Sequence, residues 1–589
     1  MQYEWKICSP NETDVQRYID ELGISRILAS KLVNQNISTD AAANIIEANY
    51  NYIKDPLNII NIEDAAKKIY EYLQKDKAII QVFGDYDCDG ITSTTILCRS
   101  LEELSKKINP EANLSIWRHI PEKIEGYGLS DSFADRFLNI ANAMPNFEFL
   151  LITVDNGITT KPVVEKLQTA NNVEVIVTDH HLPDYENNVT PTSCICVDPH
   201  MREDDEGKLL AGCGVIFNVI RKLEDIAGLD HEISDKYIYL VTIGTIGDMM
   251  MINTYHACLI QIGLNVINSV KCPLWLQIAK NNLEIRKVTA KDIAFSIAPL
   301  INSCGQMGNA RLALEALMLD DRELVSAKME KIYYIYAENK KETKETKAVA
   351  ENDIENNYTN DKFILYPMSS QHPGLVSKVA THLGKKTGVP LIVWNESEDE
   401  EKSEIISGSA RNDSKIPAMK FAKEAVANGL LESAEGHTYA FGIKMIRSKI
   451  PELKEFLNKK AQEYIEKFGD LPAKKDLKID CCASTKDINE TNMIDIEKIP
   501  FIKNLEAPVV IIKDAIIKDV YYAKNNPKNV KYTIQSEDSN NPIEIWAWDV
   551  KPKEYDPSIH TKIDIVGNIE RNFMRPDRAT LNVIDLKCH

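Results

Sequence analysis

Residues 78–97 read AIIQVFGDYDCDGITSTTIL, and this stretch decides the fold of the first half of the chain. A mostly apolar run is followed by a polar turn that contains Asp85, Asp87 and Asp89, and a helix-like segment then begins near Gly90. A buried strand that ends in a polar turn and leads into a helix is the repeating unit of an α/β sheet. The stretch therefore predicts a sheet whose strand ends carry polar side chains.

The same alternation runs from residue 61 to about residue 255. Further apolar runs stand at 114–120 (LSIWRHI), 147–154 (FEFLLITV), 173–178 (VEVIVT) and 194–198 (CICVD), with helix-like segments between them. This pattern is typical of a parallel sheet that has helices on both faces.

Four further segments flank this block. Residues 1–60 read as short polar helices and turns, and 256–360 read as helical, with one long helix expected at 322–357, where Gly and Pro are absent. A second α/β domain is expected at 361–470. Residues 475–589 carry short β-rich runs separated by Asn, Pro and Asp, which predicts a small barrel of the oligonucleotide-binding (OB) type.

The composition indicates a soluble globular protein of several domains. The chain has 589 residues, of which 44% are hydrophobic and 27% charged. The start, MQYEWKICSP, does not resemble a secretory signal, and no apolar run is long enough for a membrane span, so we expect a cytoplasmic protein. The 12 cysteines include no C-x-x-C pair, and we expect reduced, mostly buried thiols.

The formal net charge of −19 argues against tight non-specific binding to nucleic acid. It does not exclude a nuclease, because an enzyme that holds metals with carboxylates concentrates negative charge at its active site. Local basic segments such as KNNPKNVKY are still available.

The carboxylates of Asp85, Asp87 and Asp89 repel one another unless a cation neutralises them. Hard oxygen ligands suit Mg²⁺ or Mn²⁺. Thr92 and Ser93 then open a helix whose N-terminal amides could hold a phosphate. The alternative interpretation is an ordinary acidic turn with a helix cap.

Three more polar clusters stand at the ends of apolar runs in the same block. They are Asp155 in TVDNG, the triplet Asp179, His180 and His181, and Asp248 in IGTIGD. A single Asp after a strand is usually a cap or turn residue. Because ligands of open α/β sheets gather at the carboxyl ends of the strands, we expect all four clusters to converge there.

DYDCDG, VDNG, TDHH and the later GD resemble, in order and spacing, the four motifs of the DHH phosphoesterases. Longer phrases are similar to RecJ exonucleases: FGDYDCDGITSTTIL, VTDHHLP, LAGCGV, IAPLINSCGQMGNARLALE, HPGLV and GSARN. The resemblance extends from about residue 60 to residue 445, with a weaker likeness in the terminal barrel.

The resemblance implies two Mn²⁺ or Mg²⁺ ions in the first domain. Asp155 would bridge them, with Asp89, His180 and Asp248 on one ion and Asp85 and Asp87 on or near the other. His181 would contact the scissile phosphate, and Asp179 would orient the histidines. The implied chemistry is two-metal hydrolysis, with a single metal and a protein base as the alternative.

Substrate contacts are also implied by the resemblance. Ser409, Arg411 and His437 match substrate-gripping positions of the second α/β domain, and we add Asn302, Thr92 and Ser93 as candidates. Arg411 would clamp a phosphate with paired donors. A surface ion pair for Arg411 and a loop position for His437 are the alternatives.

In the terminal barrel, Trp546, Trp548 and Phe573 lie near Lys and Arg residues and could stack on bases. Alternate residues of a strand share a face, so Trp546 and Trp548 fit core packing equally well.

The chain departs from the RecJ pattern at several positions. Leu300 and Gln306 stand where RecJ proteins usually show arginines, and Glu435 adds a carboxylate next to His437. Phe83 replaces a histidine ligand that many DHH proteins carry, and PFIKNLEAP replaces a phrase that precedes the barrel. These changes bear on the substrate and leave the metal-ligand set intact.

Three hypotheses follow. The first is a processive exonuclease that releases mononucleotides from single-stranded DNA, 5′ to 3′, in recombination or repair; the resemblance implies a monomer with a helicase and a single-strand-binding protein as possible partners. The second is a phosphodiesterase for short oligonucleotides or cyclic dinucleotides. The third is a non-catalytic DNA-binding scaffold, which the retained ligand set disfavours.

Overall fold

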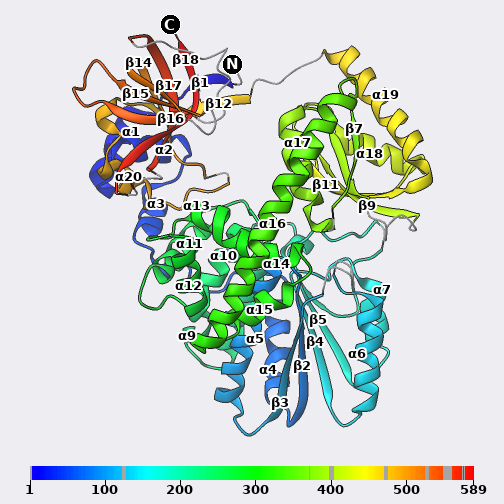
Figure 1. Cartoon of the computed structure of the whole chain (residues 1–589). Helices are drawn as coiled ribbons and strands as arrows, with labels where there is room; N and C mark the ends of the chain where they lie inside the picture. Colours follow the sequence, from blue (N-terminus) through cyan, green and yellow to red (C-terminus); the bar gives the residue numbers. More distant parts are fainter. Residues whose placement is uncertain are drawn as a thin grey trace. The chain divides into compact units, whose positions relative to one another are not determined.

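The computed structural model describes residues 3–121, 128–186, 188–370, 372–396, 404–469, 475–503, 505–523, 529–547, 560–572, 575 and 577–588. The chain forms two compact units, each with its own sheets (Figure 1). The first combines Met1–His119, Gly128–Ala298 and Lys474–His589, and the second is built mainly from Pro299–Ala473. The segments predicted at 1–60 and 475–589 and most of the segment predicted at 61–255 thus lie within one unit.

The predicted parallel sheet of the first unit is confirmed. Its strand order is β3-β2-β4-β5-β6, and every neighbouring pair is parallel. The strands are buried over most of their length, which explains why their sequences are almost continuously apolar. They are β2 (Lys77–Phe83), β3 (Asn113–His119), β4 (Glu148–Val154), β5 (Val173–Thr178) and β6 (Ile195–Val197).

Helices cover both faces of this sheet (Figure 1). On one face, α6 (Asp131–Ala143) and α7 (Lys161–Leu167) pack on β2, β4 and β5 through an aromatic and aliphatic core. The other face contacts α4 (Ile62–Leu73), α5 (Cys88–Ile108) and α8 (Gly212–Ile226).

The apolar run before Asp248 forms a buried helix and not a strand. This helix, α10 (Ile238–Gly247), is surrounded by α5, α8 and α11 (Thr254–Ile267). Asp248 is its C-cap, so the expectation that all four polar clusters follow strands is wrong for this one. Burial on every side removes the amphipathic periodicity that would mark a helix. The first unit continues with α9 (Glu232–Lys236), α12 (Leu274–Asn282), α13 (Ala290–Asp292) and a π-helical turn at Ile293–Ile297.

The N-terminal segment belongs with the C-terminal barrel. Its helices α1 (Glu12–Leu22), α2 (Arg26–Asn34) and α3 (Thr39–Ile46) are preceded by β1 (Tyr3–Ile7), a strand that we did not predict. β1 pairs in parallel with β12 (Lys475–Ile479). Lys31 of α2 is buried with its Nζ 3.3 Å from Asp480 Oδ2, and Asp480 also accepts hydrogen bonds from Asn34 and from the backbone N–H of Val509.

The C-terminal strands close into a five-stranded barrel, as predicted. Pairing runs β14-β15-β16-β18-β17 and returns from β17 to β14. The barrel strands are β14 (Val509–Tyr522), β15 (Val530–Gln535), β16 (Ile543–Ala547), β17 (Lys562–Arg571) and β18 (Ala579–Cys588), and β13 (Cys481–Cys482) and α20 (Glu490–Ile496) flank them.

The second unit is the predicted second α/β domain with the long helix. α14 (Ala298–Gln306) and α15 (Ala310–Leu317) precede α16, which spans Arg322–Asn357. The sheet order is β10-β11-β9-β8-β7, with only β7 and β8 parallel. Its strands are β7 (Ile364–Met368), β8 (Leu391–Asn395), β9 (Ile405–Arg411), β10 (Leu431–His437) and β11 (Ala440–Ile446), and its helices are α17 (Val376–Thr387), α18 (Ala418–Ala427) and α19 (Ile450–Phe468).

No helix in the described ranges is both long and apolar enough to cross a membrane. Most of the 12 cysteines are buried.

Lys31→Met should destabilise the joint between the N-terminal segment and the barrel, because it leaves the buried Asp480 carboxylate without its cation. We expect a loss of about 3 kcal/mol in the free energy of unfolding, measured in urea by far-ultraviolet circular dichroism. The matched control is Lys6→Met, which breaks the exposed Lys6–Asp476 pair of the β1–β12 ribbon and should leave the urea midpoint unchanged. Equal effects of the two changes would contradict the proposed role of the buried pair.

Candidate metal centre

The turn after β2 carries three carboxylates into the start of α5. Asp87 is the N-cap of this helix, and its Oδ1 accepts a hydrogen bond from the backbone N–H of Gly90 at 3.0 Å. A Cβ atom at Gly90 would lie 2.5 Å from the carbonyl oxygen of Asp85, so only glycine allows this close turn. The helix-cap interpretation is therefore correct for Asp87, and it is compatible with a ligand role.

Seven polar side chains meet beside this turn. Three groups each place their nitrogen or oxygen atoms within 4.8 Å of one another. The groups are Asp85, Asp87 and Asp155; Asp89, His180 and Asp248; and Asp155, His180 and His181. The first two sets match the division between two ions that the resemblance implies.

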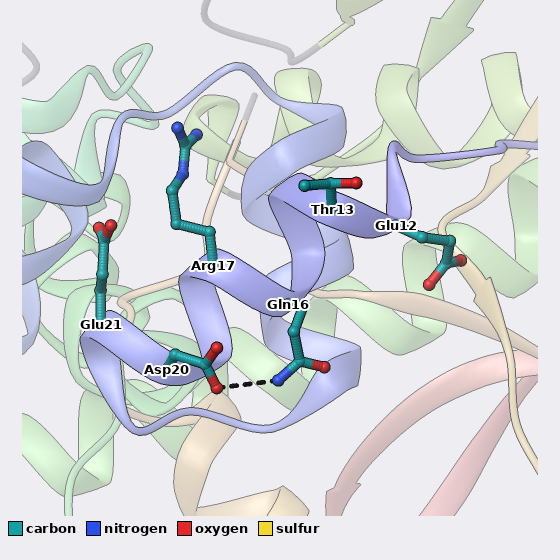
Figure 2. Close-up of a pocket in the computed structure, with 6 residues that line it drawn as sticks. All are labelled: Glu12, Thr13, Gln16, Arg17, Asp20 and Glu21. Atoms are coloured by element: carbon teal, nitrogen blue, oxygen red, sulfur yellow. Dashed lines mark hydrogen bonds between the residues drawn. The ribbon is translucent and has the colours of Figure 1, made fainter.

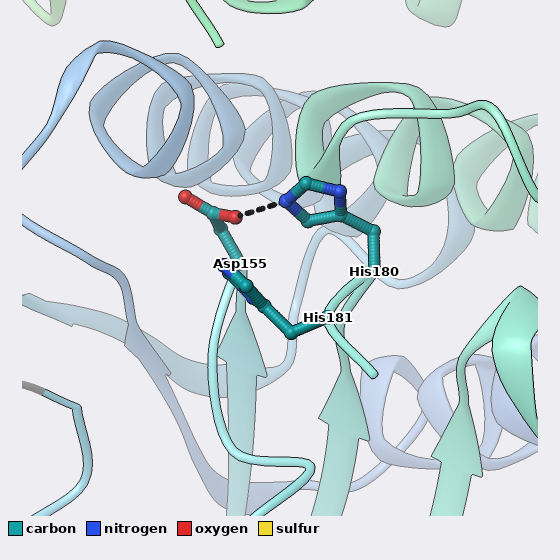
Figure 3. Close-up of side chains that lie close together, drawn as sticks. All are labelled: Asp155, His180 and His181. Carbon is teal, nitrogen blue, oxygen red and sulfur yellow. Dashed lines mark ion pairs between the residues drawn. The ribbon is translucent and has the colours of Figure 1, made fainter. Parts of the chain in front are cut away.

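His180 lies at the centre of the cluster. Its Nε2 is 3.1 Å from Asp155 Oδ1 (Figure 3) and 3.8 Å from both Asp89 Oδ2 and Asp248 Oδ2. His180 is buried, and it follows β5 just as Asp155 follows β4. Because β4 and β5 are parallel neighbours, their carboxyl ends bring these two side chains together.

Asp155 adopts an unusual backbone conformation. Its φ is +61°, in the left-handed region that Asp and Asn tolerate better than most residues. A Cβ atom at Gly212 would lie 2.7 Å from the Cβ of Asp155, so the start of α8 packs directly against it. The left-handed backbone of Asp155 and the start of α8 therefore fix the position of the Asp155 carboxylate.

Asp179 holds His181. Its Oδ1 lies 2.7 Å from His181 Nδ1 and accepts hydrogen bonds from the backbone N–H groups of His180 and His181. Its Oδ2 accepts from the backbone N–H of Ile158 at 2.9 Å. The imidazole that Asp179 contacts is that of His181, whose side chain is 47% exposed, whereas the His180 ring faces the carboxylates.

Backbone amides at the start of α8 also contact the cluster, which the sequence analysis missed. The N–H groups of Gly212 and Cys213 donate to the two carboxylate oxygens of Asp89 at 2.6 and 3.0 Å. A helix N-terminus favours a bound carboxylate. The phrase LAGCGV contained this signal, because its glycines leave room for a close approach.

Burial and like charges together disfavour ionisation of several carboxylates in the cluster. Burial, followed by repulsion from neighbouring carboxylates, raises the pKa of Asp85 and Asp155 well above the usual value. The same causes raise the pKa of Asp248 to about 8. Among the described residues, Asp85 Oδ1 and Asp155 Oδ1 are buried and accept no hydrogen bond, although His180 Nε2 lies 3.1 Å from Asp155 Oδ1. A divalent cation would satisfy these oxygens and let the carboxylates ionise, so the donor set fits Mg²⁺ or Mn²⁺.

The two histidines differ in charge. Burial and the neighbouring His181 lower the pKa of His180, which keeps it neutral and able to bind a metal. Burial opposes protonation of His181 as well, but the hydrogen bond and charge of Asp179 outweigh it and raise its pKa to about 9. The neutral imidazole of His180 can thus bind a metal, whereas the imidazole of His181 is a cation.

Thr92 and Ser93, expected to help hold a phosphate, are fully buried in α5. The Thr92 hydroxyl donates to the backbone carbonyl of Asp89 at 3.0 Å. Their burial argues against direct contact with a substrate. In a helix that is covered on several sides, small polar residues serve close packing.

The remaining predicted substrate residues lie in the second unit. Ser409 is buried, and its Oγ accepts a hydrogen bond from Arg411 Nη1 at 2.7 Å. Arg411 also donates to Thr381 Oγ1 at 3.0 Å, and no carboxylate of the described residues forms an ion pair with it, in contrast to the alternative interpretation. Asn302 lies on α14, and His437 ends β10, although its side chain lies outside the described part.

The departures from the RecJ pattern have local explanations. Leu300 is buried in α14, and Gln306 accepts a hydrogen bond from Asn339 Nδ2 at 3.2 Å. Phe83 is buried and stacks on His119 with ring centroids 5.4 Å apart. The side chain of Glu435 lies outside the described residues.

In the barrel, Trp546 is half-buried between the buried Ile545 and Ala547. Because strand neighbours alternate, Trp546 faces away from the barrel core, opposite Lys531 of β15. Trp548 and Phe573 lie outside the described residues.

A shallow hollow beside α1 lies apart from this chemistry (Figure 2). All of its lining residues are exposed, and its Gln16–Asp20 hydrogen bond joins residues of the same helix. We assign no function to it. The lining consists of Glu12, Thr13, Gln16, Arg17, Asp20 and Glu21.

Three known domains match the chain in order. They are the N-terminal domain of the DHH family over residues 79–245, the DHHA1 domain over residues 360–465 and the RecJ OB domain over residues 479–585. The chain belongs to the DHH family. Its domain set is that of the RecJ type within this family.

Individual relatives support this DHH-family assignment. The single-stranded-DNA-specific exonuclease RecJ of Bacillus subtilis is 27% identical over 549 residues, which are 91% of this chain and 64% of that protein. The chain thus spans slightly less than two thirds of that relative.

Solved structures of RecJ share the fold. RecJ of Thermus thermophilus in complex with Mn²⁺ has a TM-score of 0.78 at 21% identity, covering 99% of this chain and 79% of that one. Another, exonuclease RecJ bound to manganese, has a TM-score of 0.56 at 27% identity and covers 69% of this chain and 95% of that one.

Asp155→Asn should separate metal binding from folding at this DHH-family centre. Asparagine tolerates the left-handed backbone, so the fold should persist. We expect Mn²⁺ to raise the Tm of the unaltered protein by a few degrees and to have little effect on the variant, as measured by differential scanning fluorimetry.

In chelator, the variant should be at least as stable as the unaltered protein, because one of the mutually repelling carboxylates is gone. The control is Asp204→Asn, since the Asp204 side chain is 89% exposed and belongs to none of the three groups that could hold a metal. An undiminished Mn²⁺ shift in Asp155→Asn would contradict the assigned site.

Proposed function

We propose that the chain is a metal-dependent exonuclease that hydrolyses the phosphodiester bonds of single-stranded DNA. The observation that carries the proposal is the convergence of seven ligand-type side chains at one sheet edge, in a chain that also has the RecJ OB domain. The named activity of the Bacillus subtilis relative supplies the substrate class.

Two divalent ions fit the cluster. We assign Asp85 and Asp87 to one ion and Asp89, His180 and Asp248 to the other, with Asp155 between them. RecJ of Thermus thermophilus has been solved with Mn²⁺ and with Mg²⁺, which suits these oxygen-rich ligands. When bound, such ions supply Lewis-acid charge at the phosphate and a water of lowered pKa.

His181 is the protein group that we place against the scissile phosphate. It is half-exposed at the edge of the cluster and is kept cationic by Asp179. A protonated imidazole can donate a hydrogen bond to a non-bridging phosphate oxygen, where negative charge grows during the reaction. Asp179 acts through His181 and is a positioning residue.

Ser409 and Arg411 of the second unit are the proposed phosphate contacts in that unit, together with Asn302 and His437. Arg411 is already held by Ser409 and Thr381, so its guanidinium is oriented before a substrate arrives. Trp546 is a candidate stacking residue on the barrel.

Several finer features remain predictions. They are 5′-to-3′ polarity, mononucleotide products, a role in recombination or repair, a helicase and a single-strand-binding protein as partners, a monomeric state and a cytoplasmic location.

The activity test uses single-stranded DNA labelled at either end, with Mn²⁺ or with chelator, and products sized on a gel. We expect shortening of the strand in Mn²⁺, no product in chelator, and no detectable turnover by Asp155→Asn. Asp179→Asn should cut more slowly by roughly 10- to 100-fold because His181 loses its partner. Asp204→Asn should cut at the normal rate.

Intact DNA in Mn²⁺, or equal cutting by Asp155→Asn, would overturn the proposal. Faster cleavage of dinucleotides than of long strands would instead support a short-oligonucleotide phosphodiesterase. The presence of the RecJ OB domain argues against that alternative.

A further inference from the structure

Lys378 of α17 is a partly buried cation in the second unit. Its Nζ donates to Asn339 Oδ1 at 2.7 Å, and Asn339 is 1% exposed on the facing side of α16. The Nδ2 of Asn339 donates in turn to Gln306 Oε1 at 3.2 Å. A hydrogen-bonded chain across three helices therefore fixes the position of the ammonium group.

Two more lysines add positive charge beside it. Lys340 and Lys347 of α16 both repel Lys378, and burial together with these neighbours lowers the pKa of Lys378 to about 8. Within the described part of the chain, none of the three ammonium groups has a carboxylate oxygen at ion-pair distance, 4.0 Å or less. Glu351, the acidic residue that influences Lys347, is itself engaged by His382 and Lys386.

Lys386, which lies on α17 like Lys378, is an ordinary ion-paired lysine. Its Nζ is 2.6 Å from Glu351 and 2.8 Å from Glu355, so its charge is compensated within the protein. Lys378 has a neutral amide as its partner and two cations as neighbours. Uncompensated charge of one sign that is partly removed from water is costly, unless a ligand supplies the opposite charge.

The lysines adjoin residues that we have already placed at the substrate. Ser377, next to Lys378, has its Oγ 3.3 Å from the Oγ of Ser409. Thr381, one helical turn further along α17, accepts the hydrogen bond from Arg411. Residues on both sides of Lys378 in α17 thus contact Ser409 and Arg411.

We propose that Lys378, supported by Lys340 and Lys347, binds a backbone phosphate of the single strand other than the one that is cleaved. The inference rests on the proposed nuclease function and extends it to a second phosphate position. A phosphodiester suits the site because it carries one negative charge and two acceptor oxygens. The Asn339 amide would hold the ammonium in place, as in a preformed anion site.

The test measures binding of a fluorescent oligothymidylate to the full chain in chelator, where no cleavage occurs, by anisotropy at a series of salt concentrations. Lys378→Gln keeps a donor for Asn339 but removes the charge. It should weaken binding by roughly fivefold to tenfold, as expected for one charge-assisted contact. The slope of log affinity against log salt should become shallower by about 0.7, the value for one phosphate contact on a single strand.

Lys378→Arg should restore both quantities, and Lys386→Gln is the matched control that should change neither. The double change Lys340→Gln, Lys347→Gln should also reduce the salt slope, although it leaves the Asn339 hydrogen bond intact. Thymidine monophosphate as a competitor distinguishes a backbone phosphate from a free nucleotide, since only the former predicts an unchanged mononucleotide affinity in Lys378→Gln.

An unchanged salt slope in Lys378→Gln would overturn the inference, as would an equal loss of mononucleotide affinity. These outcomes are separate from failure of the nuclease proposal. Cleavage in Mn²⁺ with unaltered binding by Lys378→Gln would reject the phosphate site alone. Lys378-dependent binding without any cleavage would reject the nuclease and keep the site.

Discussion

The repulsion among buried carboxylates at one edge of a parallel sheet is the constraint on which the rest of the first unit depends. Asp85, Asp89 and Asp155 are buried, Asp87 and Asp248 are half-buried, and burial raises the pKa of most of these carboxylates. Such an arrangement is stable with ionised side chains only when cations share the site. The fold therefore brings together carboxylates that need bound cations to compensate their charge.

The scaffold supports the cluster with backbone groups. Two amides at the start of α8 hold Asp89, and glycines at 90 and 212 permit contacts that any side chain would block. Asp155 and Met249 adopt left-handed backbone conformations beside the site. Strained or glycine-dependent backbone of this kind is common at functional sites, where placement of a ligand outweighs local stability.

Much of this was predictable from the sequence. The strand before Asp85 and the strands before Asp155 and His180 were evident, because parallel strands that are buried on both faces are continuously apolar. The sequence was misleading for α10. A helix that is buried on all sides has no amphipathic periodicity, so its apolar run resembled another strand. β1 was missed because it is short and pairs with residues more than 470 positions away. The amides that hold Asp89 were missed because backbone donors leave almost no sequence signal. The phosphate role of Thr92 and Ser93 stays a prediction, for side chains that the structure shows fully buried.

The most direct measurement is anomalous diffraction from crystals of the full chain soaked in Mn²⁺. The account predicts two anomalous peaks at the end of the sheet, one contacted by Asp85, Asp87 and Asp155 and the other by Asp89, Asp155, His180 and Asp248. A map without a peak at these side chains, with their carboxylates hydrogen-bonded to one another or to water at full Mn²⁺ concentration, would contradict it.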